Sequence, residues 1–442
     1  MLVAAGAQSA VSGGTWGKAQ RVPGLATAGP SGILSVSCAS PGNCSAGGYL
    51  SGSSSGRQAF VVSEKNGIWG KAEQVPGTAA LNTGGMGEVD SVSCASPGNC
   101  SAAGEYATPA PRSYPVHAFV VSEKNGIWGK AEKVPGIAAL SKGSQAQVDS
   151  VSCAAPGDCG AGGSLSGGSG QQAFVVSQKN GTWGTAKKVP GLAAPHTIGF
   201  VNSVSCTSAG TCSAGGYYVR PPGTGERAFV VSQRNGRWGK ALQIPRMSEI
   251  SSLSCASAGN CSAGGGVFAV SEKKGTWGKA GKLPGLAALS KGGHAVISSV
   301  SCGAAGNCSA GGWFSAGDSA DQGFIVSQDS GIWGTAEEVP GLAALSTGGP
   351  TFVISVSCGA AGTCSAGGSY ASRTHRQQGF VVSQDNGVWG KAEEIPGLAA
   401  LNRDGFAQVN SVSCVSAGSC SAGGSYLDHS RLSQAFVVSR AR

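Results

Sequence analysis

The sequence predicts an all-β fold, an eight-bladed β-propeller with four antiparallel strands in each blade. A motif close to Ser-Val-Ser-Cys-x5-Cys-Ser-Ala-Gly-Gly occurs eight times in the 442 residues, with its first cysteines 47 to 59 residues apart. The segment at residues 59–73 recurs unchanged at residues 118–132, and related copies follow in the later repeats. Four strands at a period of about 50 residues are typical of propeller blades, so eight copies predict eight blades.

Each repeat contains the signals of four strands, as its second copy illustrates. Residues 90–94 alternate in polarity and predict a first strand, and the turn residues at 95–99 lead to a second strand that starts at Cys100. Residues 118–122 are apolar on both faces and predict a third strand that is buried on both sides. The Asn-Gly turn at 124–126 tolerates positive φ and connects to a fourth strand over residues 127–134.

The two ends of the chain predict how the ring of blades closes. The chain opens with a single fourth strand at residues 16–23 and ends with a single third strand at residues 435–439. We expect these strands to share one composite blade, which removes a free sheet edge. Residues 1–442 then form one propeller domain; a linear solenoid, the alternative, would leave both half-repeats unpaired. Residues 1–10 fit either the remnant of a secretory signal or a frayed end.

The 16 cysteines fall into eight Cys-x5-Cys pairs, each across one predicted hairpin. Facing strands bring two such thiols within disulfide reach, so we expect eight disulfides, an oxidising compartment and a secreted, extracellular protein. Free buried thiols are the alternative. A metal site has no support, because Cys-x2-Cys clusters are absent and the chain has only five histidines. The expected bridges are Cys38–Cys44, Cys94–Cys100, Cys153–Cys159, Cys206–Cys212, Cys255–Cys261, Cys302–Cys308, Cys358–Cys364 and Cys414–Cys420.

The turn between the third and fourth strands carries Ser-Gln-Asp-Asn-Gly-Val-Trp at residues 383–389 and Ser-Gln-Asp-Ser-Gly-Ile-Trp at residues 327–333. These segments resemble the Asp-box, or bacterial neuraminidase repeat, of sialidase-type propellers, although the tryptophan comes one residue early and most copies have lysine for aspartate. The whole repeat is similar to the Cys-paired propeller repeats of secreted actinobacterial proteins. The resemblance implies a propeller whose Asp-box turns are structural and far from any active site. The tryptophan of each repeat is expected to pack between blades.

The connections between strands indicate which face carries function. Those between strands one and two and between strands three and four are short and nearly uniform, whereas the other two kinds are longer and differ in every repeat. Variable loops on a rigid scaffold are typical of recognition, so we expect a site only on the loop face. The candidate ligand-binding residues there are Arg373 and a set of aromatic residues, Tyr49, Tyr106, Tyr217, Tyr218, Trp313, Tyr370 and Tyr426. The alternative is that these aromatic side chains pack between blades.

Charged side chains accompany the aromatic residues on the loop face and suit polar ligands, anionic ones included. They are Arg57, Glu105, Arg112, His117, Arg220, Glu226, Arg227, Asp318, Asp321, His375, Arg376, Asp404, Asp428, His429 and Arg431. The fifth repeat has almost no loop between its second and third strands, and its preceding connection is also short. We hypothesise a groove there, walled by Tyr217, Tyr218 and Trp313.

We interpret the protein as a secreted binding or scaffold propeller, lectin-like in the sense that aromatic side chains stack on sugars, with a glycan or cell-surface polymer as its partner. A glycoside hydrolase or polysaccharide lyase is the less favoured alternative, because no carboxylate pair stands out and the repeats are nearly uniform. A ligand-free structural propeller, recently amplified or engineered, is the third. The net charge of +9 without basic runs does not support nucleic-acid binding, no apolar run is long enough to span a membrane, and we expect a monomer without cofactors.

Overall fold

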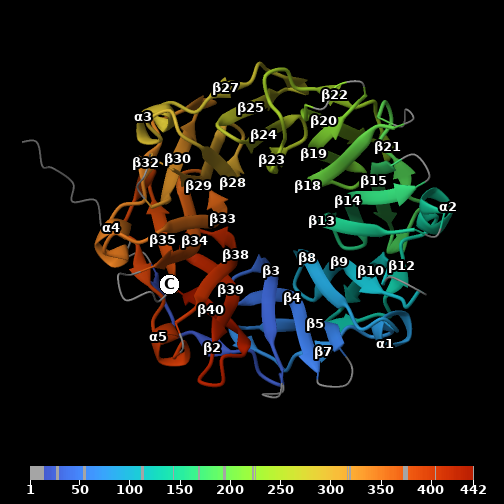
Figure 1. Ribbon diagram of the computed structural model, residues 1–442, viewed down its shortest axis with the longest axis horizontal. Coiled ribbons are helices and arrows are strands. Elements are labelled where there is room, and N and C mark those ends of the chain that lie inside the picture. Colours follow the sequence, from blue (N-terminus) through green and yellow to red (C-terminus); the bar gives the residue numbers. More distant parts are fainter. Residues whose placement is uncertain are drawn as a thin grey trace, which may run out of the picture.

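Eight small sheets stand around a common axis in the computed structural model (Figure 1), so the predicted eight-bladed all-β propeller is confirmed. The structure describes residues 14–25, 29–52, 56–110, 114–142, 144–167, 170–192, 196–221, 223, 225–315, 317, 320–371, 377–403 and 405–441. Consecutive strands of each blade pair antiparallel, and the cysteine-bearing first strand is innermost.

The first four blades are built as follows. Blade one holds β3 (Ser31–Ser40), β4 (Asn43–Gly52), β5 (Gly56–Lys65), β6 (Ile68–Trp69) and β7 (Glu73–Gln74). Blade two holds β8 (Gly87–Ser96), β9 (Asn99–Ala107), β10 (Val116–Lys124), β11 (Ile127–Trp128) and β12 (Glu132–Lys133). Blade three holds β13 (Ala146–Ala155), β14 (Asp158–Gly167), β15 (Gly170–Lys179), β16 (Thr182–Trp183) and β17 (Lys187–Lys188). Blade four holds β18 (Ile198–Ser208), β19 (Thr211–Val219), β20 (Arg227–Arg234), β21 (Arg237–Trp238) and β22 (Leu242–Gln243).

The remaining blades repeat this order, with shorter strands in blade five. Blade five holds β23 (Ser252–Ser257), β24 (Asn260–Gly265), β25 (Phe268–Lys273), β26 (Thr276–Trp277) and β27 (Gly281–Lys282). Blade six holds β28 (Ala295–Ala304), β29 (Asn307–Phe314), β30 (Gln322–Asp329), β31 (Ile332–Trp333) and β32 (Glu337–Glu338). Blade seven holds β33 (Thr351–Ala360), β34 (Thr363–Ala371), β35 (Gln377–Asp385), β36 (Val388–Trp389) and β37 (Glu393–Glu394). Blade eight holds β38 (Ala407–Ser416), β39 (Ser419–Leu427), β40 (Ser433–Ala441), β1 (Thr15–Trp16) and β2 (Gln20–Arg21).

Blade eight closes the ring as the half-repeats predicted. Both N-terminal strands pair with β40, with Trp16 opposite Arg440 and Arg21 opposite Phe436. Arg440 also donates from Nε to the carbonyl of Gly14 at 2.6 Å. The two ends of the chain therefore form one sheet.

The outer part of each blade is less regular than the sequence suggested. The single fourth strand expected over residues 127–134 is split into β11 and β12, both paired with β10. Five Pro-Gly segments then continue into one-turn helices, α1 (Thr78–Leu81), α2 (Ile137–Ser141), α3 (Leu286–Leu289), α4 (Leu342–Ser346) and α5 (Leu398–Leu401). In each case the residue before the helix is a glycine with positive φ, such as Gly136 at 77°, a conformation that glycine adopts without steric cost.

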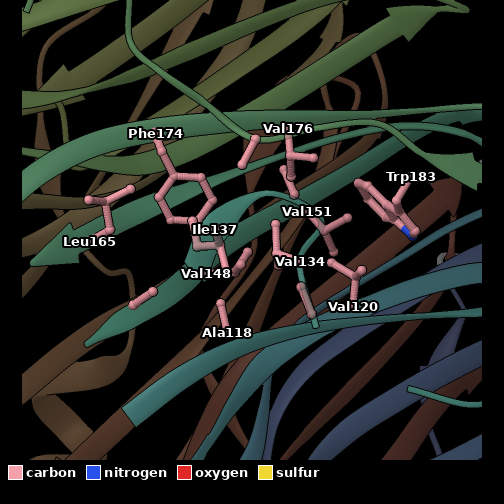
Figure 2. Packing of buried hydrophobic residues seen from close by; sticks show 14 of the residues in the cluster. Ala118, Val120, Val134, Ile137, Val148, Val151, Leu165, Phe174, Val176 and Trp183 are labelled. Atoms are coloured by element: carbon pink, nitrogen blue, oxygen red, sulfur yellow. The ribbon is translucent and has the colours of Figure 1, made fainter. Parts of the chain in front are cut away.

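The hydrophobic core is divided among the interfaces between blades. In the cluster of Figure 2, Val120 of blade two packs with Val151, Phe174 and Trp183 of blade three, all at most 5% exposed. The tryptophans of the repeats lie in such interfaces, and Trp69, for example, donates from Nε1 to Ser439 Oγ of the preceding blade at 3.2 Å. This confirms that the tryptophans pack between blades.

Serines of the Ser-Val-Ser-Cys motif join the inner strands to one another. The backbone N–H groups of Val92 and Cys94 donate to Ser35 Oγ and Ser37 Oγ of the preceding blade at 3.0 and 2.9 Å. The same two bonds recur at all eight interfaces. They satisfy donors that an innermost strand would otherwise leave without a partner.

The eight expected disulfides are all present, and no cysteine is free. In each bridge the two half-cystines face each other across the hairpin, with Cα atoms 3.9 to 4.1 Å apart. So many bridges indicate an oxidising environment. Within the described part of the chain, no helix is long and apolar enough to cross a membrane.

Candidate functional site

The short connections gather on one face of the propeller. In blade two, the N–H of Gly126, in the turn after β10, donates to the carbonyl of Gly98, in the turn after β8, at 2.8 Å. The equivalent glycines of the first and third to seventh blades form the same bond. The two kinds of short turn thus share a turn face, and the variable connections lie on the opposite loop face, as the sequence predicted.

The side chains of each second strand alternate between two environments, and this divides the candidate aromatic residues. Tyr49, Tyr217 and Trp313 directly follow the Gly-Gly pair and are half-buried. The other four tyrosines stand one residue further along the strand, are at most 5% exposed and lie in the hydrophobic clusters between blades: Tyr106, Tyr218, Tyr370 and Tyr426. These four buried tyrosines therefore pack between blades, which was the alternative to ligand binding.

Neighbouring side chains hold the three half-buried aromatic residues in place. The guanidinium carbon of Arg57 lies 3.6 Å from the ring centroid of Tyr49. Tyr217 stacks on Phe200 of β18, with ring centroids 4.8 Å apart and planes 20° apart. Trp313 lies edge-on to Phe352 of blade seven, at 5.9 Å between centroids. Three pre-oriented aromatic side chains therefore stand near the loop-face ends of the inner strands.

Carboxylates gather on blades two and three, between Tyr49 of blade one and Tyr217 of blade four. Glu88 of β8 lies opposite Glu105 of β9 in the strand register. Arg57 of blade one forms a 2.7 Å ion pair with Glu88, so it links Tyr49 to the carboxylates. Asp90 and Asp149, on the innermost strands of blades two and three, complete what we call the axial cluster: Arg57, Glu88, Asp90, Glu105 and Asp149. Among the described residues, no group of three His, Cys, Asp or Glu side chains is placed to hold a metal ion.

Burial raises the pKa of every carboxyl group in the axial cluster. It raises the pKa of Glu105 to about 7, with repulsion from Glu88 and Asp149 adding to the effect and Arg57 opposing it. It raises the pKa of Asp149 to about 6, although a hydrogen bond from Gln147 favours the charged form. The pKa of Asp90 lies well above its usual range for the same reason, with further repulsion from Glu88. At neutral pH the cluster is therefore partly protonated.

A β-bulge positions the two aspartates, which the sequence analysis did not select. The strand register slips by one residue between Val148 and Ser150, so Asp149 leaves the regular ladder. At the same bulge position Asn410 donates from Nδ2 to the carbonyl of Ile33 in the next blade at 2.7 Å. A carboxyl group can donate there only when it is protonated, which agrees with the raised pKa values. Aligning Gln-Val-Asp-Ser at 147–150 with Gln-Val-Asn-Ser at 408–411 would have identified this position.

Other charged candidates make local contacts. Asp428 accepts hydrogen bonds from the backbone N–H groups of Ser430 and Leu432 and so shapes its own loop. His117 shares a 2.8 Å hydrogen bond with Thr108, and Asp321 accepts one from Ser315. Several further candidates lie outside the described residues, namely Arg112, Asp318, Arg373, His375, Arg376 and Asp404.

Blade five is short, as its sequence indicated. Strands β23, β24 and β25 have six residues each, and Gly266 and Val267 alone connect β24 to β25. Tyr217 of blade four and Trp313 of blade six remain half-buried on either side. Tyr218, the third wall residue of the hypothesised groove, is 5% exposed and donates from its hydroxyl to Gln243 at 3.0 Å, so it faces the interior of blade four.

Hollows occur on both faces of the propeller, although we expected a site on the loop face only. A loop-face cavity of about 770 Å³ beside blade eight is lined by Arg21, Arg403, Asp428 and His429. Four further cavities lie on the turn face, each between two neighbouring blades, and they measure about 450, 600, 340 and 330 Å³. Serine and glycine residues of the hairpins are among the residues that line these four cavities.

Comparisons with known proteins support the fold alone. No family model matches the chain, and no curated protein resembles it in sequence. Among solved structures, Chaetomium thermophilum Sqt1 bound to the N-terminus of the ribosomal protein L10 aligns with a TM-score of 0.53 at 10% identity, over 96% of this chain and 100% of that one. Penicillium chrysogenum alpha-L-arabinanase complexed with arabinobiose aligns with a TM-score of 0.38 at 12% identity, over 77% of this chain and 89% of that one.

Proposed function

We propose that the protein is a secreted binding propeller that holds a glycan, or a similar polar polymer, at the loop-face ends of its inner strands. One observation carries this proposal: Tyr49 and Tyr217 are half-buried, pre-oriented and close to the carboxylates of the axial cluster, and Trp313 of blade six is a third half-buried, pre-oriented aromatic side chain. Sugars present apolar C–H faces that stack on aromatic side chains and hydroxyl groups that donate to carboxylates. A few convergent polar groups beside apolar surface are typical of a ligand site.

The charge of the site favours a neutral ligand over an anionic one. The axial cluster has four carboxyl groups and a single guanidinium, so a polyanion would be repelled despite the overall charge of +9. Because burial raises the carboxyl pKa values, a polyhydroxyl ligand can both accept hydrogen bonds from the cluster and donate to it.

A glycan array tests this proposal. We expect binding to a defined set of neutral oligosaccharides, weakened at least tenfold in Trp313→Ala and in Tyr217→Ala, because each change removes a stacking face. Ile127→Ala, which removes an exposed apolar side chain next to the turn face, is the control and should bind as the wild type does. Glycan binding that persists unchanged in both site variants would contradict the proposed location. A blank array combined with salt-sensitive binding of a lysine-rich peptide would indicate a peptide partner instead.

A glycoside hydrolase is the second candidate, and the Glu88–Glu105 pair favours it. Directly opposed residues in an antiparallel pair have Cβ atoms about 5 Å apart, close to the carboxyl separation in retaining glycosidases. Glu105, with a pKa of about 7, would be the general acid, and Glu88, held by Arg57 at 2.7 Å, the nucleophile. The ion pair with Arg57 favours the charged form of Glu88, which a nucleophile needs, whereas the high pKa of Glu105 favours the protonated form, which a general acid needs.

Polysaccharide digestion separates the two candidates. A hydrolase should release reducing ends at a rate that falls as the pH rises above about 7. Glu105 loses its proton in that range, and only the protonated group can act as the acid. Glu105→Gln and Glu88→Gln should each abolish release, whereas Glu73→Gln, an exposed outer-strand control, should not. Glycan binding without any release of reducing ends would leave the binding propeller as the function.

A further inference from the structure

Near the turn face, a buried polar residue stands at the same place in the third strand of every blade. These residues are Glu64, Glu123, Gln178, Gln233, Glu272, Gln328, Gln384 and Arg440, and none is more than 7% exposed. Glu123 shows the common arrangement: its carboxylate accepts hydrogen bonds from Ser45 Oγ and Ser63 Oγ of the preceding blade, at 3.4 and 3.1 Å. Glu64 is held in the same way by Ser421 and Ser439, at 3.3 and 2.7 Å. The serine pair of one blade therefore offsets part of the burial cost of the carboxylate in the next, whose pKa burial still raises.

Glu272 of blade five departs from this arrangement. Glu272 is only 4% exposed, and its buried Oε2 has no hydrogen-bond partner. The serines that would hold it, Ser213 and Ser232 of blade four, lie 3.4 Å apart and within reach of each other. Trp277 Nε1 also lacks a partner at this interface, whereas Trp128 donates to the equivalent serine of its preceding blade at 3.4 Å. At the interface between blades four and five, both the carboxylate and the tryptophan therefore lack their usual serine contacts near the turn face.

A cavity of about 450 Å³ lies at this same interface, and Glu272 lines it. Thr207 also lines it, and its Oγ1 is buried without a partner. The other seven repeats have Ala, Gly or Val at the position of Thr207, namely Ala39, Ala95, Ala154, Ala256, Gly303, Gly359 and Val415. The Thr207 hydroxyl has no counterpart in the other repeats, and it lines the same cavity as the Glu272 carboxylate, which the serines of blade four do not bind. Two unpartnered polar groups in one cavity indicate a ligand site.

The rim of the cavity carries the opposite charge. Arg234 and Lys274 both line it and are exposed. Arg234 donates from Nη2 to the carbonyl of Gly275 at 3.3 Å, which places the guanidinium across the interface between the two blades. The cavity thus combines a buried anion with two cations at its mouth.

We propose that this cavity binds a small zwitterion such as a free amino acid, with its ammonium group on Glu272 and Thr207 and its carboxylate on Arg234 and Lys274. An ammonium group brings three donors to a buried carboxylate whose Oε2 has none, and its charge adds to that of Arg234, which lowers the pKa of Glu272 against the effect of burial. A guanidinium is the preferred partner of a carboxylate. The volume lies within the range of small-molecule sites. The site is on the opposite face from the proposed glycan site and does not depend on it.

Calorimetric titration of the full chain with glycine, L-serine and L-lysine tests the proposal, with acetate and 1,4-diaminobutane as probes that carry charge of one sign only. We expect saturable binding of one zwitterion per chain and weaker binding of either one-sign probe. Glu272→Gln should weaken amino-acid binding at least tenfold. Thr207→Ala, which introduces the residue of four other repeats, should weaken it less. Arg234→Ala should weaken amino-acid binding but leave binding of 1,4-diaminobutane unchanged or stronger.

The matched control is Glu123→Gln, because both oxygens of that carboxylate already have serine donors. It should bind amino acids as the wild type does. The proposal fails if no amino acid binds saturably at millimolar concentration, or if Glu272→Gln binds like the wild type. It also fails if a crystal soaked in glycine shows only ordered water at Glu272.

Discussion

At the residue scale, one missing hydroxyl group leaves a hydrogen bond unmade between blades three and four. Gln233 Oε1 is buried without a partner, whereas Gln178 and Gln328 accept at this atom from Ser101 and Ser262, at 3.4 and 3.2 Å. Blade three has Gly160 where those serines stand. We predict that Gly160→Ser stabilises the protein by about 0.5–1.5 kcal/mol, the typical net value of one hydrogen bond.

Thermal unfolding measures the effect of Gly160→Ser, and the opposite change, Ser101→Gly, should lower the melting temperature. The added Cβ would lie 3.0 Å from the sulfurs of Cys206 and Cys212. This is close, but Ser101 Oγ already lies 3.4 Å from Cys159 Sγ at an equivalent interface. A lower melting temperature for Gly160→Ser would mean that this contact outweighs the hydrogen bond.

Asp149 makes the stability of the protein depend on pH. Burial raises its pKa from 3.8 to about 6, so the folded state binds a proton that the unfolded state releases. The contribution of Asp149 to the free energy of unfolding is largest below about pH 4, falls as the pH rises to about 6 and stays low above that pH. We predict that Asp149→Asn, which copies Asn410, stabilises the fold at pH 7 by up to about 3 kcal/mol, the equivalent of that shift. Calorimetry should show the gain shrinking toward zero at pH 4, and a gain that is independent of pH would refute the charge argument.

At the element scale, the serine bonds between inner strands predict a local effect. Ser35→Ala removes the acceptor of the Val92 N–H group, a 3.0 Å bond. We expect a loss of about 1–3 kcal/mol and faster hydrogen exchange at Val92, with the Val412 amide, held by Ser355 at 3.0 Å, unchanged. Ser208→Ala, at the exposed end of β18, is the control. Equal exchange rates at Val92 in both variants would show that water replaces the serine without cost.

The same scale explains how far the sequence could predict the structure. Repeat period, turn chemistry and alternation predicted the strands, the closing blade and the disulfides, because those signals are local and repeated eight times. The candidate site was harder to predict. Tyr49 and Tyr106 differ by one position along the second strand, and this shift makes Tyr49 half-buried and Tyr106 buried. The bulge at Asp149 cannot be recognised from the polarity of the sequence alone. Glu272 looks like Glu123 in sequence and differs only in its contacts with the preceding blade.

At the scale of the whole molecule, ring closure should make the eight blades one cooperative unit. Trp16 is 4% exposed and belongs to the hydrophobic cluster shared by blades seven and eight, with Val381, Leu398 and Phe436. A chain that starts at residue 24 would lose β1 and β2, expose this cluster and leave β40 as a free edge.

We predict a lower melting temperature and concentration-dependent self-association for the chain that starts at residue 24, measured by calorimetry and by light scattering. A chain that starts at residue 14 retains both strands and the bond from Arg440 to Gly14, so we expect it to melt in one transition as a monomer, and we expect the same of the full chain. The eight disulfides each span only six residues and lie within single blades, so they cannot hold the ring shut. If both truncated chains behave alike, the packing between blades is sufficient without closure, and the N-terminal strands only cover an edge.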